Sequence, residues 1–370
     1  MRFHNLIVSF LTCRSISKGL AKSHDKINRH ALVTKYNPIR TSSNPSTPLQ
    51  IGNGNFAFGG DITGLQTFLP FNTLSSWGWK NDSLPAGVTE EDVELYKGVS
   101  WPNHGRPVQY DFGGGNPIEQ WLISNPNRVN LGRIGLTFMD SAGMILNVME
   151  SDLDNTTQTL DLWSGIITST FSFQGTTATI KVSSADSSDT IAIHLDSTLV
   201  NEGRLGIFLD FPWCDGTAKF SAPFVGRFDI PSNHTTALKA SISKAVVEHQ
   251  LDAAIFVTTI TSNLFNIKRV DPIAHRYLVT PYSRPPDGKF SLTISFGLSE
   301  QEVNRDADQV LEESKQAWEE YWSKNGFIDV LTNSMDSRAN ELQRRIILSR
   351  YLMKVNEAGD TPPQEVSWVL

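Results

Sequence analysis

The chain has 370 residues, of which 39% are hydrophobic and 19% are charged, and its formal net charge is −7. This composition excludes general disorder and supplies enough apolar residues to bury a core. No basic block and no apolar run of about 18 residues occurs, so we expect no nucleic-acid partner, no anionic membrane surface as partner and no membrane-spanning helix.

The N-terminal segment, residues 1–26, has the features of a secretory signal or of a disordered leader. Arg2 gives it a positive start and an apolar run over residues 6–11 follows, although no small-residue cleavage site is evident. Three N-glycosylation sequons fit the same route, at Asn81, Asn155 and Asn233. We therefore expect a secreted protein or a protein of the secretory pathway, with a cytoplasmic location left open.

The cysteines, histidines and glycines predict no metal site and no cofactor. Cys13 and Cys214 are too few for a disulfide framework or a thiolate metal site. The histidines show no spacing typical of metal ligands. Gly52, Gly54 and Gly59 do not match the dinucleotide-binding pattern G-x-G-x-x-G, and no amphipathic helix follows them.

Residues 27–298 are predicted to form an antiparallel β-sandwich domain. Short apolar runs recur at roughly 8–12-residue spacing, with turn residues between them and no helical pattern. Apolar and polar residues alternate over 179–183 and 190–195, which places one face of each strand on a core and the other in water. The expected strands are Arg133–Phe138, Ile145–Glu150, Thr159–Trp163, Ile166–Phe173, Thr176–Ser183, Asp189–Ser197, Arg204–Phe211, Lys244–His249, Ala253–Thr261 and Phe290–Phe296, with a short strand around Phe56 and Phe58.

Two helices are predicted after the sandwich. Ser299 and Glu302 have the spacing of a capping box, which indicates a linker helix over residues 299–326. Its apolar stripe consists of Val303, Ala307, Val310, Leu311, Ala317, Trp318, Tyr321 and Trp322. A second helix is expected from near Ser337 to Asn356, within a C-terminal segment that covers residues 327–370.

A cluster of tryptophans is the densest unusual feature of the sequence. Four of the nine tryptophans lie within 45 residues, namely Trp77, Trp79, Trp101 and Trp121. Indole faces stack on the C–H faces of sugar rings, while amides and Arg106 can hydrogen-bond to hydroxyl groups. We therefore select Trp77, Trp79, Trp101 and Arg106 as candidate substrate-binding residues. The alternative is that these rings only attach long loops to the sandwich.

The sequence does not identify a catalytic pair of carboxylates. The pairs Glu312–Glu313 and Glu319–Glu320 lie on the polar side of the expected linker helix, where exposure to solvent explains them. Asp140, Asp215 and Asp252 occur in expected turns. Neither a G-x-S-x-G motif nor a P-loop is present. The catalytic residues therefore stay unassigned.

Several blocks of the sequence resemble a known family of enzymes, the six-hairpin glycosidases. The organisation is similar to that of family 65-type glycoside hydrolases, and the resemblance covers about residues 27–365. The block 48–59 resembles the start of their N-terminal β-sandwich, and 121–136 is similar to a block of uncharacterised fungal members. Residues 318–329, 341–352 and 356–365 resemble the entry into their helical barrel. The resemblance implies a mainly β chain with a C-terminal α part: an antiparallel β-sandwich, a helical linker and the first helices of an (α/α)6 barrel.

The same resemblance implies that the barrel in this chain is incomplete. Relatives continue past the Pro-Pro-Gln-Glu turn into the helices that carry the catalytic acids, whereas this sequence stops at Leu370. Gln364 and Glu365 are kept as candidate substrate-binding residues near the expected barrel mouth, with fraying as the alternative for Glu365. Without neighbouring helices the apolar face of residues 342–355 would be uncovered, and we expect self-association through it.

Three functions stay open on this basis. The favoured one is a glycoside hydrolase-like, carbohydrate-active protein that lacks its catalytic acids in this chain and has a carbohydrate as its partner. Hydrolysis in such enzymes requires one carboxylic acid to protonate the leaving oxygen and a second carboxylate to activate water or phosphate. The alternatives are a non-catalytic carbohydrate-binding module and an inactive product of a truncated gene.

Overall fold

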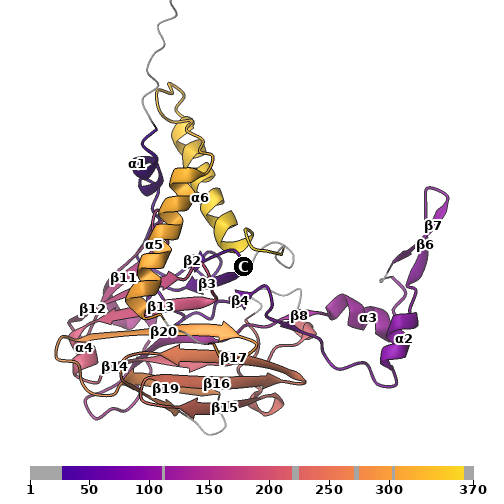
Figure 1. The fold of residues 1–370 in the computed structure, drawn as a ribbon, viewed down its shortest axis with the longest axis horizontal. Helices are drawn as coiled ribbons and strands as arrows, with labels where there is room; N and C mark the ends of the chain where they lie inside the picture. The colour runs from indigo at the N-terminus through magenta and orange to yellow at the C-terminus, as the bar shows by residue number, and fades with distance from the viewer. Residues whose placement is uncertain (1–26, 111–112, 219–224, 271–274, 302–304, 362–370) are drawn as a thin grey trace, which may run out of the picture.

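The computed structural model describes residues 27–110, 113–218, 225–270, 275–301 and 305–361. The signal-like segment with Cys13, the candidates Gln364 and Glu365, and Glu302 and Val303 of the predicted linker helix lie outside the described residues. In the described part the chain is mainly β with few helices, and its sheets are antiparallel, as the sequence predicted (Figure 1).

The largest sheet has nine strands in the order β1-β10-β11-β12-β13-β20-β17-β16-β15. Along β12 the buried residues Ala178, Ile180 and Val182 alternate with more exposed ones, which is the predicted two-residue period. The strands are β1 (Ile39–Arg40), β10 (Leu153–Asp161), β11 (Ile166–Phe173), β12 (Thr176–Ser184), β13 (Thr190–Asp196), β15 (Thr235–Ala240), β16 (Lys244–Leu251), β17 (Ala254–Thr261) and β20 (Lys289–Gly297).

A second sheet of four strands packs on the first. Its order is β18 (Phe265–Arg269), β19 (Arg276–Pro281), β14 (Leu205–Asp210) and β9 (Arg133–Phe138). The rings of Phe138 on β9 and Phe173 on β11 lie 4.7 Å apart between their centroids, so the two sheets share one core. Between them the two sheets thus form the predicted sandwich.

One predicted strand is wrong. In the expected strand Ile145–Glu150, Ile145 makes only an isolated bridge with Met139, and Glu150–Asp152 forms a 3₁₀ turn. The carboxylate of Asp140 accepts the backbone N–H groups of Ala142 and Met144, which closes a turn instead. Ile145 is also exposed, so no core stabilises a strand there.

Smaller elements complete the body of the protein. The helices α1 (Arg29–Thr34) and α4 (Thr198–Asn201) are short. A three-stranded sheet consists of β2 (Leu49–Gly52), β3 (Phe56–Gly60) and β4 (Thr73–Ser75), and β3 confirms the short strand expected around Phe56 and Phe58.

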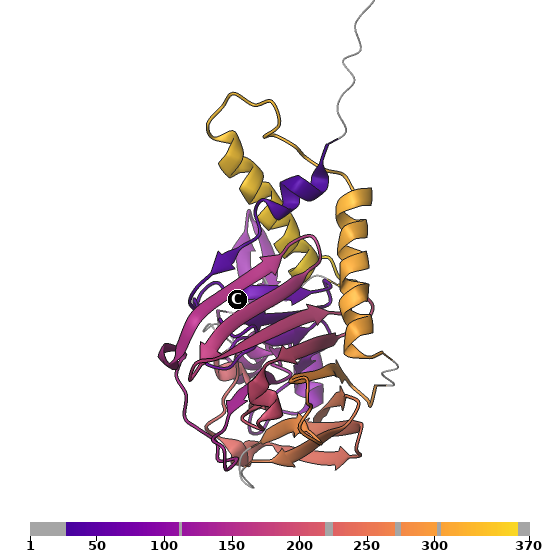
Figure 2. The same cartoon turned by 90° about the vertical axis from the view of Figure 1, so that its left-hand side faces the viewer.

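The helix α5 (Ala307–Lys324) packs on strands β11, β12, β13 and β20, and Figure 2 shows it standing along the sheet. It begins at Ala307, later than predicted, because its capping box is formed by Asp306 and Gln309. The backbone N–H of Gln301 instead donates to Thr259 Oγ1, which holds that stretch against the sheet. The predicted apolar stripe is confirmed at its core, where Trp322 Nε1 donates to the Leu162 carbonyl at 2.7 Å.

The second helix, α6 (Ala339–Asn356), buries only one part of its apolar face. Ile347, Tyr351 and Val355 belong to the shared core. Leu342 and Leu352 were expected on the same face but are exposed, because the packed side of the helix is narrower than predicted. In the part of the chain that the structure describes, no helix is long and apolar enough to cross a membrane.

An arm, defined as residues 81–126, projects from the sandwich (Figure 1). It leaves the body after β5 (Trp79–Lys80) and returns at β8 (Asn127–Arg128), and these two short strands pair at its root. Between them lie α2 (Glu90–Leu95), the hairpin of β6 (Val99–Asn103) and β7 (Arg106–Tyr110), and α3 (Pro117–Ser124).

Candidate functional site

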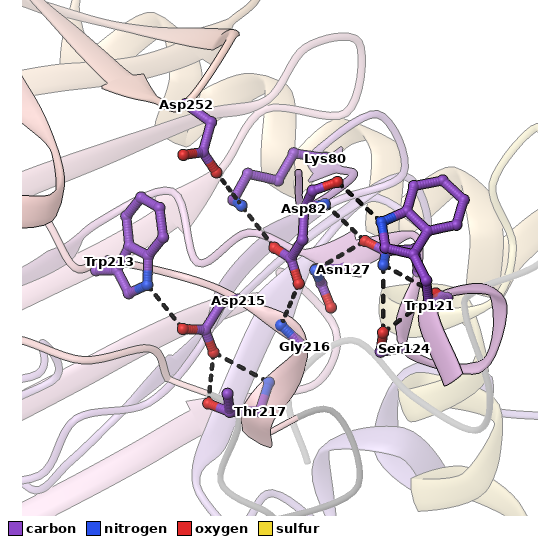
Figure 3. A network of polar contacts seen from close by, with 11 residues as sticks. Lys80, Asp82, Trp121, Ser124, Asn127, Trp213, Asp215, Gly216, Thr217 and Asp252 are labelled. Carbon is purple, nitrogen blue, oxygen red and sulfur yellow. Dashed lines mark hydrogen bonds and ion pairs between the residues drawn. The ribbon is translucent and has the colours of Figure 1, made fainter. Parts of the chain in front are cut away.

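The root of the arm is built around a buried lysine. The side chain of Lys80 is only 1% exposed, and its Nζ lies 2.8 Å from Asp82 Oδ1 and 2.9 Å from Asp252 Oδ2. The ammonium group also lies 4.7 Å from the centre of the Trp213 ring (Figure 3). Burial by itself lowers the pKa of Lys80, but the hydrogen bonds and charges of the two aspartates outweigh it, so the pKa is raised and the lysine stays charged.

Asp82 joins the two ends of the arm to the loop of residues 211–217, here called the Trp213 loop. Its second carboxylate oxygen accepts the backbone N–H of Gly216 at 2.9 Å. Its backbone N–H donates to Asn125 Oδ1 at 2.7 Å, and its carbonyl accepts Trp121 Nε1 at 3.0 Å. Figure 3 shows these contacts converging from both ends of the arm. The network therefore closes the arm at its root.

Asp215 holds the Trp213 loop in its conformation. Its carboxylate accepts Trp213 Nε1 at 2.8 Å and the backbone N–H of Thr217 at 3.0 Å. Burial raises the pKa of Asp215. The hydrogen bonds from the Thr217 hydroxyl, Trp213 and the Thr217 N–H, together with the Lys80 charge, lower it by a larger amount, so the net pKa lies below the ordinary value. Asp215 is therefore suited to remain an anion and not to act as a general acid.

The hairpin of the arm brings two of the predicted site residues onto one face. Trp101 lies opposite Val108 and Asn103 lies opposite Arg106, so Trp101, Asn103 and Arg106 share a side of the two-stranded ribbon. Trp101 is 48% exposed. Its ring lies against Gly113, where a Cβ would come within 3.1 Å of ring atoms. This face is an exposed aromatic ring beside an amide and a guanidinium group.

The other two predicted tryptophans lie nearer the sandwich and differ in exposure. Trp79 is 52% exposed and sits at the root of the arm, opposite Arg128. Trp77 is half-buried, stacks on Phe256 with centroids 6.3 Å apart, and donates its Nε1–H to Asp189 at 2.6 Å. Trp79 is thus open to a ligand, while the N–H of Trp77 already has a partner.

The sequence did not point to Lys80 or to Trp213. From its neighbours in the sequence, Lys80 would be expected at the protein surface. Its partner Asp252 comes from the distant turn between β16 and β17. The buried thiol of Cys214 lies in the same loop as Trp213, and burial raises its pKa to about 12. Among the described residues, no group of three histidine, cysteine or acidic side chains is placed to hold a metal ion.

No protein-family model matches this chain, and no curated protein matches it. Three solved structures are similar in outline. The first is a provisionally assigned kojibiose phosphorylase from the human microbiome, with a TM-score of 0.43, 9% identity, and coverage of 86% of this chain and 38% of that chain. The second is a bacterial glucoamylase complexed with acarbose, with a TM-score of 0.42, 10% identity, and coverage of 86% and 42%.

The third is a glycosyl hydrolase of family 92, CcMan5, with a TM-score of 0.43, 10% identity, and coverage of 89% of this chain and 41% of that chain. This chain therefore spans about two fifths of the length of these solved chains.

Proposed function

We propose that this chain is a glycoside hydrolase-like, carbohydrate-active protein in which the described residues hold and present a substrate. The observation that carries the proposal is the packing of two blocks that resemble the six-hairpin glycosidases, one near each end of the sequence. Tyr351 Oη donates to the Gln50 carbonyl at 3.0 Å, and the backbone N–H of Gly54 donates to the Val355 carbonyl at 3.1 Å. The strands and the helix that the resemblance implies thus form one packed unit.

The protonation state and the contacts of the aspartates at the arm root support a positioning role for them and not a catalytic role. A glycosidase acid must hold a proton near neutral pH, which requires a raised pKa. Asp215 has a lowered pKa, and both oxygens of Asp82 already bind Lys80 and Gly216. This network stabilises the arm, and we assign no hydrolytic step to it.

The arm hairpin is proposed as the substrate-contacting surface. The exposed ring of Trp101 offers an apolar face to a sugar ring, and Asn103 and Arg106 on the same side can hydrogen-bond to its hydroxyl groups. Trp79 offers a second exposed ring at the root of the arm. The second candidate function, a non-catalytic carbohydrate-binding module, is favoured by the same exposed rings.

The test is a calorimetric titration of the whole chain with gluco- and manno-oligosaccharides, together with an assay on aryl glycosides. Trp101→Ala is expected to weaken binding about tenfold or more, equivalent to about 1.4 kcal/mol. Gly113→Ala is expected to weaken binding as well, because the added Cβ displaces the Trp101 ring.

Gly105→Ala is the matched control for Gly113→Ala. Both glycines have positive φ, 79° at Gly105 and 105° at Gly113, but a Cβ at Gly105 meets no atom within 4 Å. Binding with turnover supports the hydrolase-like function, and binding without turnover supports the binding module. A flat titration with both sugar classes and no turnover contradicts both.

A further inference from the structure

Three buried histidines form a cluster directly behind Trp213. His234 precedes β15, His249 lies on β16, and His275 precedes β19, so three separate segments contribute to it. The ring centroids of His234 and His275 lie 3.9 Å apart, and those of His234 and His249 lie 5.0 Å apart. All three residues are more than nine-tenths buried. The ring of Trp213 lies 6.4 Å from that of His234, so the Trp213 loop rests on this cluster.

The hydrogen bonds of His275 require its neutral form. Its Nε2 lies 2.8 Å from the Pro231 carbonyl, which can only accept, so Nε2 carries the proton. Its Nδ1 lies 2.9 Å from Thr236 Oγ1. That hydroxyl already accepts from Arg269 and from Tyr277 Oη, so its own proton points at Nδ1. A second proton on His275 would therefore face a donor and, behind it, a guanidinium charge.

His249 and His234 are neutral for a similar reason. Their facing nitrogens, His249 Nε2 and His234 Nδ1, lie 2.9 Å apart and share one proton. His249 Nδ1 is buried and has no hydrogen-bond partner among the described residues. A buried N–H without an acceptor is costlier than a bare lone pair, so Nε2 is the protonated nitrogen of His249. Protonating His249 would create an unsatisfied buried N–H.

The charged groups around the cluster do not compensate a positive charge on it. None of the carboxylates among the described residues hydrogen-bonds to any of the three rings, and the nearest acids already have partners of their own. The elements around the cluster carry these titratable and charged groups: Lys80, Asp210, Cys214, Asp215, Arg227, Asp229, Asp252, Arg269, Arg276 and Tyr277. Lys239, Lys244 and Glu248 on β15 and β16 form ion pairs of their own at the surface, and Lys268 on β18 is exposed.

We propose that His234, His249 and His275 form an acid-sensitive latch, which keeps the Trp213 loop and the root of the arm closed at neutral pH and releases them on acidification. The cluster supports Trp213, whose ring faces Lys80, and the Trp213 loop binds Asp82 through Gly216. The latch concerns the position of the arm and does not depend on carbohydrate binding.

The pKa values give the direction and size of the response. Burial, together with the charge that a protonated His275 would add, lowers the pKa of His234 to about 4, and burial lowers that of His249 as well. In an opened state both return towards the ordinary value of 6.5, so acid favours opening below about pH 6.5. His234 alone raises the opening constant roughly 50-fold between pH ~7 and pH ~4.5.

The test is hydrogen–deuterium exchange of the whole chain at pH ~7 and pH ~4.5, corrected for the intrinsic exchange rate. We expect residues 211–217 and 121–128 to exchange more than tenfold faster in acid, while β11 keeps its protection. His234→Gln combined with His249→Gln removes the response, since amides do not titrate. His104→Asn, in the exposed turn of the hairpin, is the control and keeps it.

If the double variant does not fold, a second measurement on the unaltered protein tests the latch. In the unaltered protein labelled with ¹³C at histidine Cε1, the ring signals of His234 and His249 should stay in the neutral form well below pH 6.5 and titrate together with the opening of the Trp213 loop. If these two ring signals titrate near pH 6.5 without any loss of protection, that result overturns the latch. So does acid-induced exchange that is equal in residues 211–217 and in β11.

Discussion

The ammonium group of Lys80 lies 4.7 Å from the centre of the Trp213 ring, at the point where the arm joins the sandwich. Lys80 belongs to β5, and Trp213 belongs to the loop after β14. Asp252, from the turn between β16 and β17, binds the same ammonium group. One buried cation thus connects three segments that are far apart in the sequence.

Replacing this cation is expected to destabilise the protein. Lys80→Met keeps the aliphatic stem but leaves Asp82 and Asp252 without their counter-charge. Both aspartates are partly exposed, so we expect the free energy of unfolding to fall by about 2–3 kcal/mol, less than for a fully buried pair. Urea denaturation followed by circular dichroism measures it. Lys239→Met is the control, because Lys239 forms an exposed pair with Glu248 and should change stability much less. Equal losses in the two variants would contradict the prediction.

Asp189 and Asp215 are expected to respond to pH with opposite signs. Asp189 accepts Ser75 Oγ at 2.5 Å and Trp77 Nε1 at 2.6 Å, yet burial raises its pKa above the ordinary 3.8. The folded state then binds this proton more tightly than the unfolded state, so Asp189 destabilises the fold progressively as the pH rises through its folded pKa. Asp189→Asn keeps an accepting oxygen and carries no charge. We expect it to be more stable than the unaltered protein at pH ~7, with the difference vanishing near pH ~4.

Asp215→Asn is the matched comparison for Asp189→Asn. The pKa of Asp215 is lowered, so its ionised form stabilises the fold above the ordinary 3.8 and this contribution is lost as the pH falls through the folded pKa. Asp215→Asn should therefore be less stable than the unaltered protein at pH ~7. Urea denaturation at both pH values gives the two signs, and a shared sign for the two variants would refute the assignment.

The outward face of α6 is predicted to cause self-association. Leu342 is 50% exposed and Met353 is 54% exposed, and they lie on one side of the helix with the half-buried Ile346 between them. Replacing Leu342 and Met353 together by lysine should shift sedimentation towards a monomer. Leu95→Lys, at an exposed position on α2 of the arm, serves as the control and should leave the distribution unchanged. A monodisperse monomer of the unaltered chain at high concentration would disprove the prediction.

Much of the sandwich could be predicted from local pattern. The bounds of β9 and β11 match the expected strands. Successive side chains on a strand face core and solvent in turn, so the strand can be recognised from the polarity of consecutive residues. The start of α5 could not be placed in the same way. Ser299 and Asp306 both offer a local cap, and only the contact of Gln301 with Thr259 on the sheet decides between them.

The candidate site was predictable only in its aromatic part. The tryptophan cluster and Arg106 stand out in the sequence by composition, and the register of the β6–β7 hairpin, a local pairing, then places Trp101 and Arg106 on one face. Nothing local marks Lys80 as buried. Its environment is set by Asp252 and Trp213, which reach it through the sheet topology.

The mainly β class, the positions of about half of the strands and the two late helices could be predicted from the sequence, since these follow from periodicities of two and of three to four residues. Which polar residues are buried together, in the Lys80 network and the three-histidine cluster, depends on the tertiary structure. Their energies depend on desolvation and on contacts between segments distant in the chain, and neither quantity is encoded in neighbouring residues.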